Sequence, residues 1–89
     1  MHHNLSKEDK TKRLNKIIGQ LNGINRMNDE DRDCPDILIQ IASARAALAK
    51  LGMMITEDHI EHCITSSSKK GQGEKSMLSL SKALKQMLR

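Results

Sequence analysis

The chain has 89 residues and no Phe, Tyr or Trp, and its 15 Lys and Arg outnumber its 11 Asp and Glu to give a net charge of +4. We expect a chain of this length to form one small domain over residues 1–89, and it lacks the aromatic platforms with which RNA-recognition sheets and OB-folds stack bases. The excess of positive charge is compatible with binding to a polyanion.

The amino-terminal segment has no apolar core of the kind found in signal peptides, and we identify no apolar run of membrane-spanning length. These features predict a cytoplasmic protein that does not bind membranes. In a reducing compartment, two well-separated cysteines such as Cys34 and Cys63 are more often metal ligands, redox sensors or core residues than a structural disulfide.

The first predicted element is an amphipathic helix over about 7–28. Ser6 is suited to the N-cap, and Glu8 and Asp9 fall in the first turn, where the helix dipole favours negative charge. Apolar side chains then recur at steps of three and four residues, namely Leu14, Ile17, Ile18, Leu21, Ile24 and Met27. A polar connector follows.

Pro35 suits the first turn of a second helix, predicted over about 35–65, with Cys34 as its N-cap or the neighbour of its N-cap. A break at Gly52 would divide this helix in two. A helix this long, apolar on more than one side, needs a partner subunit to cover it. After a loop rich in Ser, Lys and Gly, a third helix is predicted over about 74–88. The predicted fold is therefore all-α, with three helices of which the first two form an antiparallel hairpin.

His59 and Cys63 lie four residues apart, which on a helix places an imidazole and a thiol on one face, about 6 Å apart along the axis. This is a spacing typical of metal ligands. Cys34 is a third candidate, but 29 residues of continuous helix would separate it from Cys63 by about 43 Å. Two antiparallel helices in a dimer would instead set Cys34 of one chain against His59 and Cys63 of the other.

Two sulfur ligands and one nitrogen ligand suit Cu(I) in a trigonal site. A fourth ligand, His2 or His3, would shift the preference toward Ni(II), Co(II) or Zn(II). The same two thiols could instead form a disulfide or polysulfide bridge on oxidation. A hydrolase built on Cys and His is not expected, because the chain lacks Gly-rich turns for an oxyanion hole.

The segment from Arg13 to Met27, Cys34, the run Leu-Ile-Gln-Ile-Ala at 38–42 and the motif His59-x3-Cys63 closely resemble the copper-sensing repressor family, which also contains nickel/cobalt, formaldehyde and persulfide sensors. The resemblance covers about 7–65. It implies an all-α protomer that dimerises through a four-helix core and assembles as a tetramer. It also implies a repressor that binds double-stranded operator DNA without metal and is released by Cu(I), so that efflux or detoxification genes are expressed.

Carried over by position, the metal ligands of the family match Cys34, His59 and Cys63, and the leader ligand of its nickel sensors falls on His2. The basic positions that contact DNA match Arg13 and Lys50, with Lys16 and Arg45 as additional contacts.

Two positions depart from the copper-sensing pattern. Asp33 stands where copper sensors often carry Tyr, and Ser79 falls near the glutamate that couples the metal site to DNA in the family. Two alternatives therefore stay open. One is a nickel/cobalt sensor with an amino-terminal histidine as fourth ligand, and the other is a persulfide sensor that uses Cys34 and Cys63 without any metal.

Overall fold

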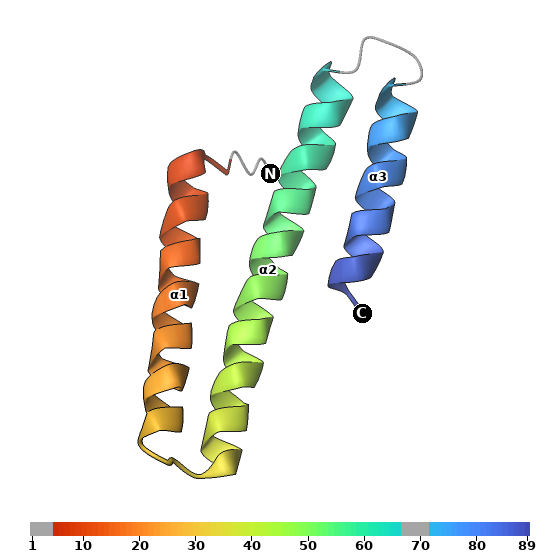
Figure 1. Cartoon of the computed structure of the whole chain (residues 1–89). Coiled ribbons are helices and arrows are strands. Elements are labelled where there is room, and N and C mark those ends of the chain that lie inside the picture. Colours follow the sequence, from red (N-terminus) through yellow and green to blue (C-terminus); the bar gives the residue numbers. More distant parts are fainter. Residues whose placement is uncertain (1–4, 67–71) are drawn as a thin grey trace. The chain divides into compact units, whose positions relative to one another are not determined.

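The structure, a computed structural model, describes residues 5–66 and 72–89, with the side chains of 62–66 and 72 left out. These residues form three α-helices and no strand, which confirms the predicted all-α fold (Figure 1). The helices are α1 (Lys7–Asp29), α2 (Cys34–Ser66) and α3 (Gln72–Met87). Each predicted boundary lies within two residues of the observed one.

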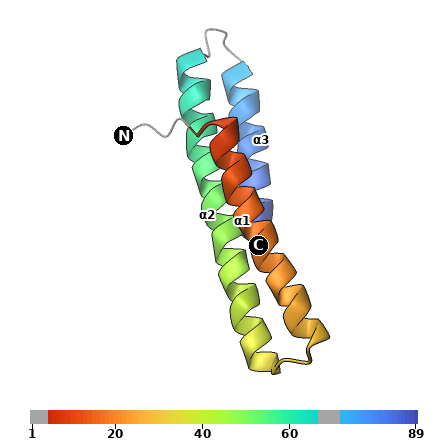
Figure 2. The ribbon, with the colours of Figure 1, turned by 90° about the vertical axis from the view of Figure 1, so that its left-hand side faces the viewer.

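The helices divide into two compact units, with the boundary inside α2. The hairpin unit is Ser6–Leu51, and in both Figure 1 and Figure 2 its α1 lies beside the first part of α2. The distal unit is Gly52–Arg89 together with Leu5, and it contains the rest of α2 and α3. The single domain expected from chain length stays a prediction.

A capping box fixes the start of α1. The Asp9 amide donates to Ser6 Oγ (3.1 Å), and the Ser6 amide donates to Asp9 Oδ2 (3.3 Å). Two backbone donors that the helix leaves without a partner are thereby satisfied. Ser6 is the N-cap, as its sequence position predicts.

The turn between α1 and α2 is a Schellman motif with aspartate in place of the usual glycine. Asp31 has φ of 54°, the Asp31 amide donates to the Asn28 carbonyl (3.2 Å), and the Arg32 amide donates to the Met27 carbonyl (3.0 Å). Asp tolerates the left-handed region better than most residues. Two residues later, the Asp33 carbonyl accepts from the Ile37 amide (3.2 Å), which makes Cys34 the first residue of α2.

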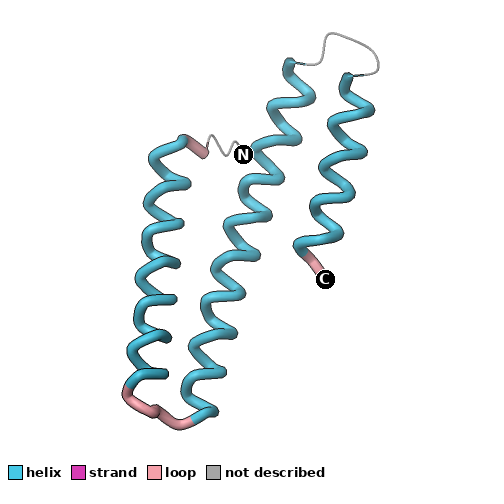
Figure 3. The backbone as a smooth tube through the Cα atoms, viewed as in Figure 1, coloured by secondary structure: helices cyan, strands magenta, loops and turns pink. Residues whose placement is uncertain are grey.

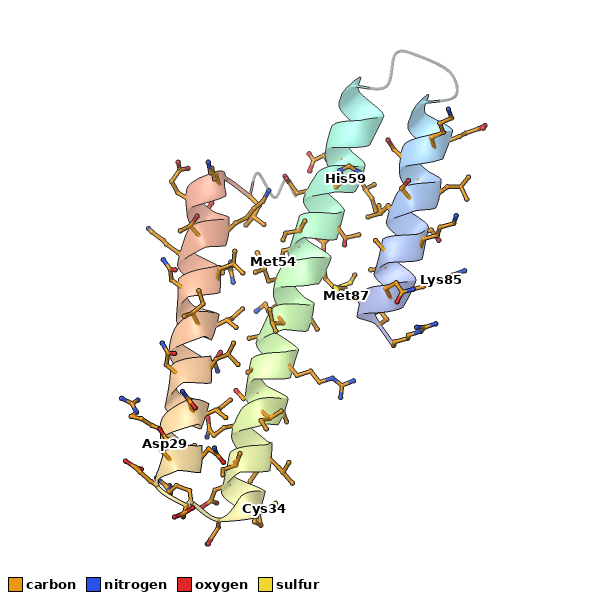
Figure 4. The ribbon with its side chains drawn as sticks, viewed as in Figure 1. Asp29, Cys34, Met54, His59, Lys85 and Met87 are labelled. Atoms are coloured by element: carbon orange, nitrogen blue, oxygen red, sulfur yellow. The ribbon has the colours of Figure 1, made fainter. Side chains whose placement is uncertain are left out.

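Helix α2 continues without a break through Gly52, as Figure 3 shows. The hydroxyl of Thr56 donates to the Gly52 carbonyl (2.7 Å) within the helix. A Cβ atom at position 52 would overlap Met87 Sδ, so glycine lets the end of α3 sit directly against α2 (Figure 4). The two cysteines therefore belong to one helix.

Few apolar side chains are covered within one chain. Among the described residues, the buried apolar side chains are Ile17, Ala44 and Leu51. Large apolar side chains with more than a third of their surface exposed are Leu14, Ile18, Leu21, Leu38, Ile39, Ile41, Leu48, Met53, Ile55, Met77, Leu78, Met87 and Leu88. Exposure on this scale is typical of a chain that buries its helices against further copies or partners.

We expected no segment of membrane-spanning length. Judged by length and composition, this expectation is wrong. Residues 34–61 of α2 pass that test, with 11% of the segment buried. Arg45 and Lys50 interrupt the apolar run of this helix, but its mean hydropathy is still high enough for a membrane span. The core helix of a helical assembly passes the same test, so this finding is weak support for a membrane span.

Replacing Asp31 with glycine should raise the free energy of unfolding by about 0.5 kcal/mol, because glycine adopts a positive φ without a Cβ penalty. Urea unfolding at one fixed protein concentration, followed by circular dichroism, measures this change. Lys12→Gly, at an exposed position inside α1, is the control and should lower the same quantity by about 0.7 kcal/mol. Equal destabilisation by both variants would contradict the motif.

Candidate functional site

Cys34 is positioned by the turn between the first two helices. It is the first residue of α2, it is exposed, and its thiol is free (Figure 4). The Schellman motif fixes the backbone immediately before Cys34, together with the hydrogen bond that the Asp33 carbonyl accepts from the Ile37 amide. An exposed thiol at the first residue of a helix is accessible to a second molecule.

His59 and Cys63 lie on the distal part of α2. Because the backbone is helical at both positions, their Cα atoms are about one turn, or roughly 6 Å, apart along the axis. The imidazole of His59 is exposed, and nothing is described of the side chain of Cys63. The helical spacing that suggested a metal site is therefore present in the backbone.

One chain does not bring the predicted ligands together. About seven turns of continuous helix separate Cys34 from His59. Among the described residues, no group of three or more His, Cys, Asp or Glu side chains is placed to hold a metal. His2 and His3 lie outside the described residues. A site made of Cys34, His59 and Cys63 requires a second copy of the chain.

His59 faces a cavity of about 530 Å³ between α2 and α3 of the distal unit. The α3 side of this cavity carries Lys75, Ser76 and Ser79, and the α2 side also carries Thr56. Ser79, which was expected near the position of the family's coupling glutamate, thus lines the same cavity as His59. Sequence reasoning missed Lys75 and Ser76, although their spacing from Ser79 by four and three residues places all three on one helix face.

A second pocket, of about 350 Å³, lies within the hairpin unit and is strongly basic. It is lined by Arg13, Lys16 and Gln20 from α1 and by Ala47 and Lys50 from α2, with the apolar Ile17 and Leu51 completing the lining. No carboxylate is among these residues. Three of the four basic residues predicted to bind DNA therefore surround one pocket.

The spacing of the side chains explains this pocket. Arg13, Lys16 and Gln20 follow one another at three and four residues on α1, so they share a face. The side-chain amide of Gln20 donates to Ser43 Oγ (3.3 Å), which links α1 to α2 on that face. Arg45 is exposed but does not line the pocket, because five residues of helix rotate it by about 140° from Lys50.

Comparison with known proteins gives concordant results. A family model described as "Metal-sensitive transcriptional repressor" matches residues 6–87. The copper-sensing transcriptional repressor CsoR of Bacillus subtilis is 40% identical over 82 residues, covering 90% of this chain and 81% of that protein. The copper-sensing transcriptional repressor RicR of Mycobacterium tuberculosis is 37% identical over 65 residues, covering 73% of this chain and 68% of that protein.

Two solved structures are similar over nearly the whole chain. The copper-sensing repressor CsoR with Cu(I) from Geobacillus thermodenitrificans has a TM-score of 0.84 and 36% identity, covering 100% of this chain and 93% of that one. The nickel-responsive transcriptional regulator InrS has a TM-score of 0.81 and 34% identity, covering 98% of both chains. The relatives are repressors, which confirms the prediction of a protein that is not an enzyme. The chain belongs to the metal-sensitive transcriptional repressor family.

Proposed function

We propose that the protein is a copper-responsive repressor that binds double-stranded operator DNA without metal and dissociates when it binds Cu(I), so that copper efflux or detoxification genes are expressed. The observation that carries this proposal is the set of thiol and imidazole donors on α2, in a chain 36% identical to a repressor solved with Cu(I). Such a regulator acts in the cytoplasm, where its operator is.

The donor chemistry fits Cu(I), which favours thiolate and imidazole ligands and accepts three of them. The fit requires two chains. Cys34 of one protomer would meet His59 and Cys63 of its partner, because α2 keeps Cys34 about seven turns from His59 within one chain. When bound, Cu(I) supplies a strong link between the two protomers.

The exposed apolar side chains support the assembly that this site needs. Leu38, Ile41 and Leu48 on α2 are each between 46% and 57% exposed in one chain. Pairing α1 and α2 of two chains into a four-helix bundle would remove such surface from water, at about 25 cal/mol per Å² of apolar area. We therefore propose a homodimer as the unit that forms the metal site and a tetramer of two such dimers.

The basic pocket of the hairpin unit supports binding to DNA. Arg13, Lys16 and Lys50 converge on one pocket without a carboxylate, which suits a phosphate group of the DNA backbone. Arg45, on another face of α2, would make a separate contact. Phosphate contacts give affinity that falls steeply with salt concentration.

Release of DNA follows from thermodynamic linkage between the binding of Cu(I) and the binding of DNA. The three donors, once they hold Cu(I), would fix Cys34 of one protomer beside His59 of its partner. Binding of Cu(I) weakens binding of DNA only if the arrangement that the donors prefer differs from the arrangement that fits DNA. Ser79 and Lys75 of α3 line the cavity that His59 faces. Helix α3 would therefore be affected when a bound metal fixes the position of His59.

A nickel sensor is the second candidate, favoured by the similarity to the nickel-responsive regulator InrS. It would use His2 or His3 as a fourth ligand beside Cys34, His59 and Cys63, and the same set could hold Co(II) or Zn(II). A persulfide sensor that uses only the two thiols is an outcome that the copper experiment below distinguishes.

Lys50→Ala and Arg13→Ala should each weaken operator binding and make its dependence on salt shallower. The slope of log affinity against log salt concentration should fall in magnitude by about 0.9 for each DNA phosphate that the variant no longer neutralises. Fluorescence anisotropy with the DNA upstream of the protein's own gene measures both quantities. Lys82→Ala, an exposed position on α3 outside the pocket, is the matched control. An unchanged slope in both pocket variants would contradict the proposed interface.

Addition of Cu(I) should lower the affinity for that DNA by roughly 5–150-fold, the usual range of coupling between two sites. Cys34→Ala, His59→Ala and Cys63→Ala should bind DNA without metal as the wild type does and lose this response. His62→Ala replaces a histidine that is not a predicted ligand, so it should keep the response. Release by Ni(II) or by polysulfide, with no effect of Cu(I), would overturn the copper assignment in favour of the corresponding alternative.

A further inference from the structure

Gln20 is the uncharged polar residue in the lining of the basic pocket of the hairpin unit. Its side chain is half-buried, whereas the three cationic side chains of the pocket are exposed, namely Arg13, Lys16 and Lys50. The Gln20 amide donates to Ser43 Oγ (3.3 Å), so it is held between α1 and α2. A primary amide has two N–H donors, and this hydrogen bond uses one of them. Among the described residues the second N–H has no acceptor, so it can serve a group that enters the pocket.

The buried part of the pocket lining is apolar. Ile17 and Leu51 are 5% and 4% exposed, and Ala47 is half-buried. A polar group that contacts this part of the pocket loses some of its water and needs a donor in place of that water. Immobilising a lysine of the pocket costs side-chain entropy, because lysine carries its charge on a flexible four-carbon chain. Gln20 offers a donor that is already held in position, which lowers this cost.

We propose that Gln20 is a further DNA-contacting residue, which donates a neutral hydrogen bond to the phosphate oxygen that the cationic side chains attract into the pocket. Ser43 is a positioning residue, because the hydrogen bond to its hydroxyl fixes the Gln20 amide. Three positive charges without a carboxylate favour a negatively charged group over the neutral edge of a base. This inference rests on the proposed binding to operator DNA.

A neutral donor and a cation have different effects on the salt dependence of DNA binding. Gln20→Ala should lower the affinity for the DNA upstream of the protein's own gene by about fivefold or more, the factor that one net hydrogen bond contributes. The slope of log affinity against log salt concentration should stay as in the wild type, because no phosphate loses a cationic partner. Lys50→Ala should instead make this slope shallower. Fluorescence anisotropy over a series of salt concentrations measures both quantities.

DNA of unrelated sequence and equal length separates a phosphate contact from a base contact. A phosphate contact carries no sequence information, so Gln20→Ala should weaken binding to both DNAs by the same factor. A loss confined to the upstream DNA would show that Gln20 reads a base, which would overturn the proposal. Gln86→Ala, at an exposed position on α3 outside the pocket, is the matched control and should bind both DNAs as the wild type does.

Ser43→Ala separates a contact with DNA from a purely structural role of Gln20. Gln20→Ala and Ser43→Ala remove the same hydrogen bond between α1 and α2, so a structural role alone would give both variants the same loss of affinity. We expect a loss of roughly twofold for Ser43→Ala, the low end of the cost of ordering one side chain, because the donor itself is kept. Ser43→Thr keeps the hydroxyl and should restore wild-type affinity.

Gln20→Glu replaces the donor with an acceptor that carries a negative charge. It should lose more affinity than Gln20→Ala, and it should make the salt slope shallower, because the new carboxylate neutralises a cation of the pocket. Equal losses in Gln20→Ala and Ser43→Ala, or wild-type affinity in Gln20→Ala, would overturn this inference alone. If the wild type bound neither DNA, the proposed function would fail as well, so the two failures are distinguishable.

Discussion

The continuity of α2 is the constraint on which the rest of the structure depends. Gly52, the point at which the helix could have ended, carries an unbroken helical backbone and is covered by Met87 of α3. Because the helix does not turn back, the thiol at its first residue and the imidazole of His59 cannot belong to one site within one chain. A metal site with these ligands is possible only between two copies, and the apolar side chains left exposed on α2 provide the surface for that pairing.

The two compact units divide the proposed functions between them. The hairpin unit carries Cys34 and the basic pocket of Arg13, Lys16 and Lys50, whereas the distal unit carries His59 and Cys63. A metal held by all three ligands therefore connects the hairpin unit of one protomer, which would contact DNA, to the distal unit of its partner. This division would give the metal a direct route to the proposed DNA-binding surface, because a metal held by all three ligands would constrain the same unit that holds the basic pocket.

The sequence predicted the features that depend on local patterns. Apolar spacing placed three helices, Ser6 marked the first N-cap and Pro35 marked the start of α2. It did not predict the positive φ of Asp31, because the Schellman motif normally uses glycine there. The hydrogen bond from the Leu5 amide to Asp58 joins residues distant in sequence, and so does the cavity that both His59 and Lys75 line, so no periodicity could reveal them. The metal ligands stay a prediction, because within one chain the continuous helix α2 separates Cys34 from His59 and Cys63.

The most direct test of a metal site between subunits is complementation between two inactive variants. Cys34→Ala and Cys63→Ala should each bind Cu(I) poorly when pure. After unfolding and refolding together in equal amounts, random pairing gives mixed dimers with one complete site, so high-affinity Cu(I) binding should return at about one quarter of the wild-type stoichiometry per chain. Titration against a chromogenic Cu(I) chelator measures this value. If the mixture bound no more Cu(I) than the two pure variants, the site between subunits would be contradicted.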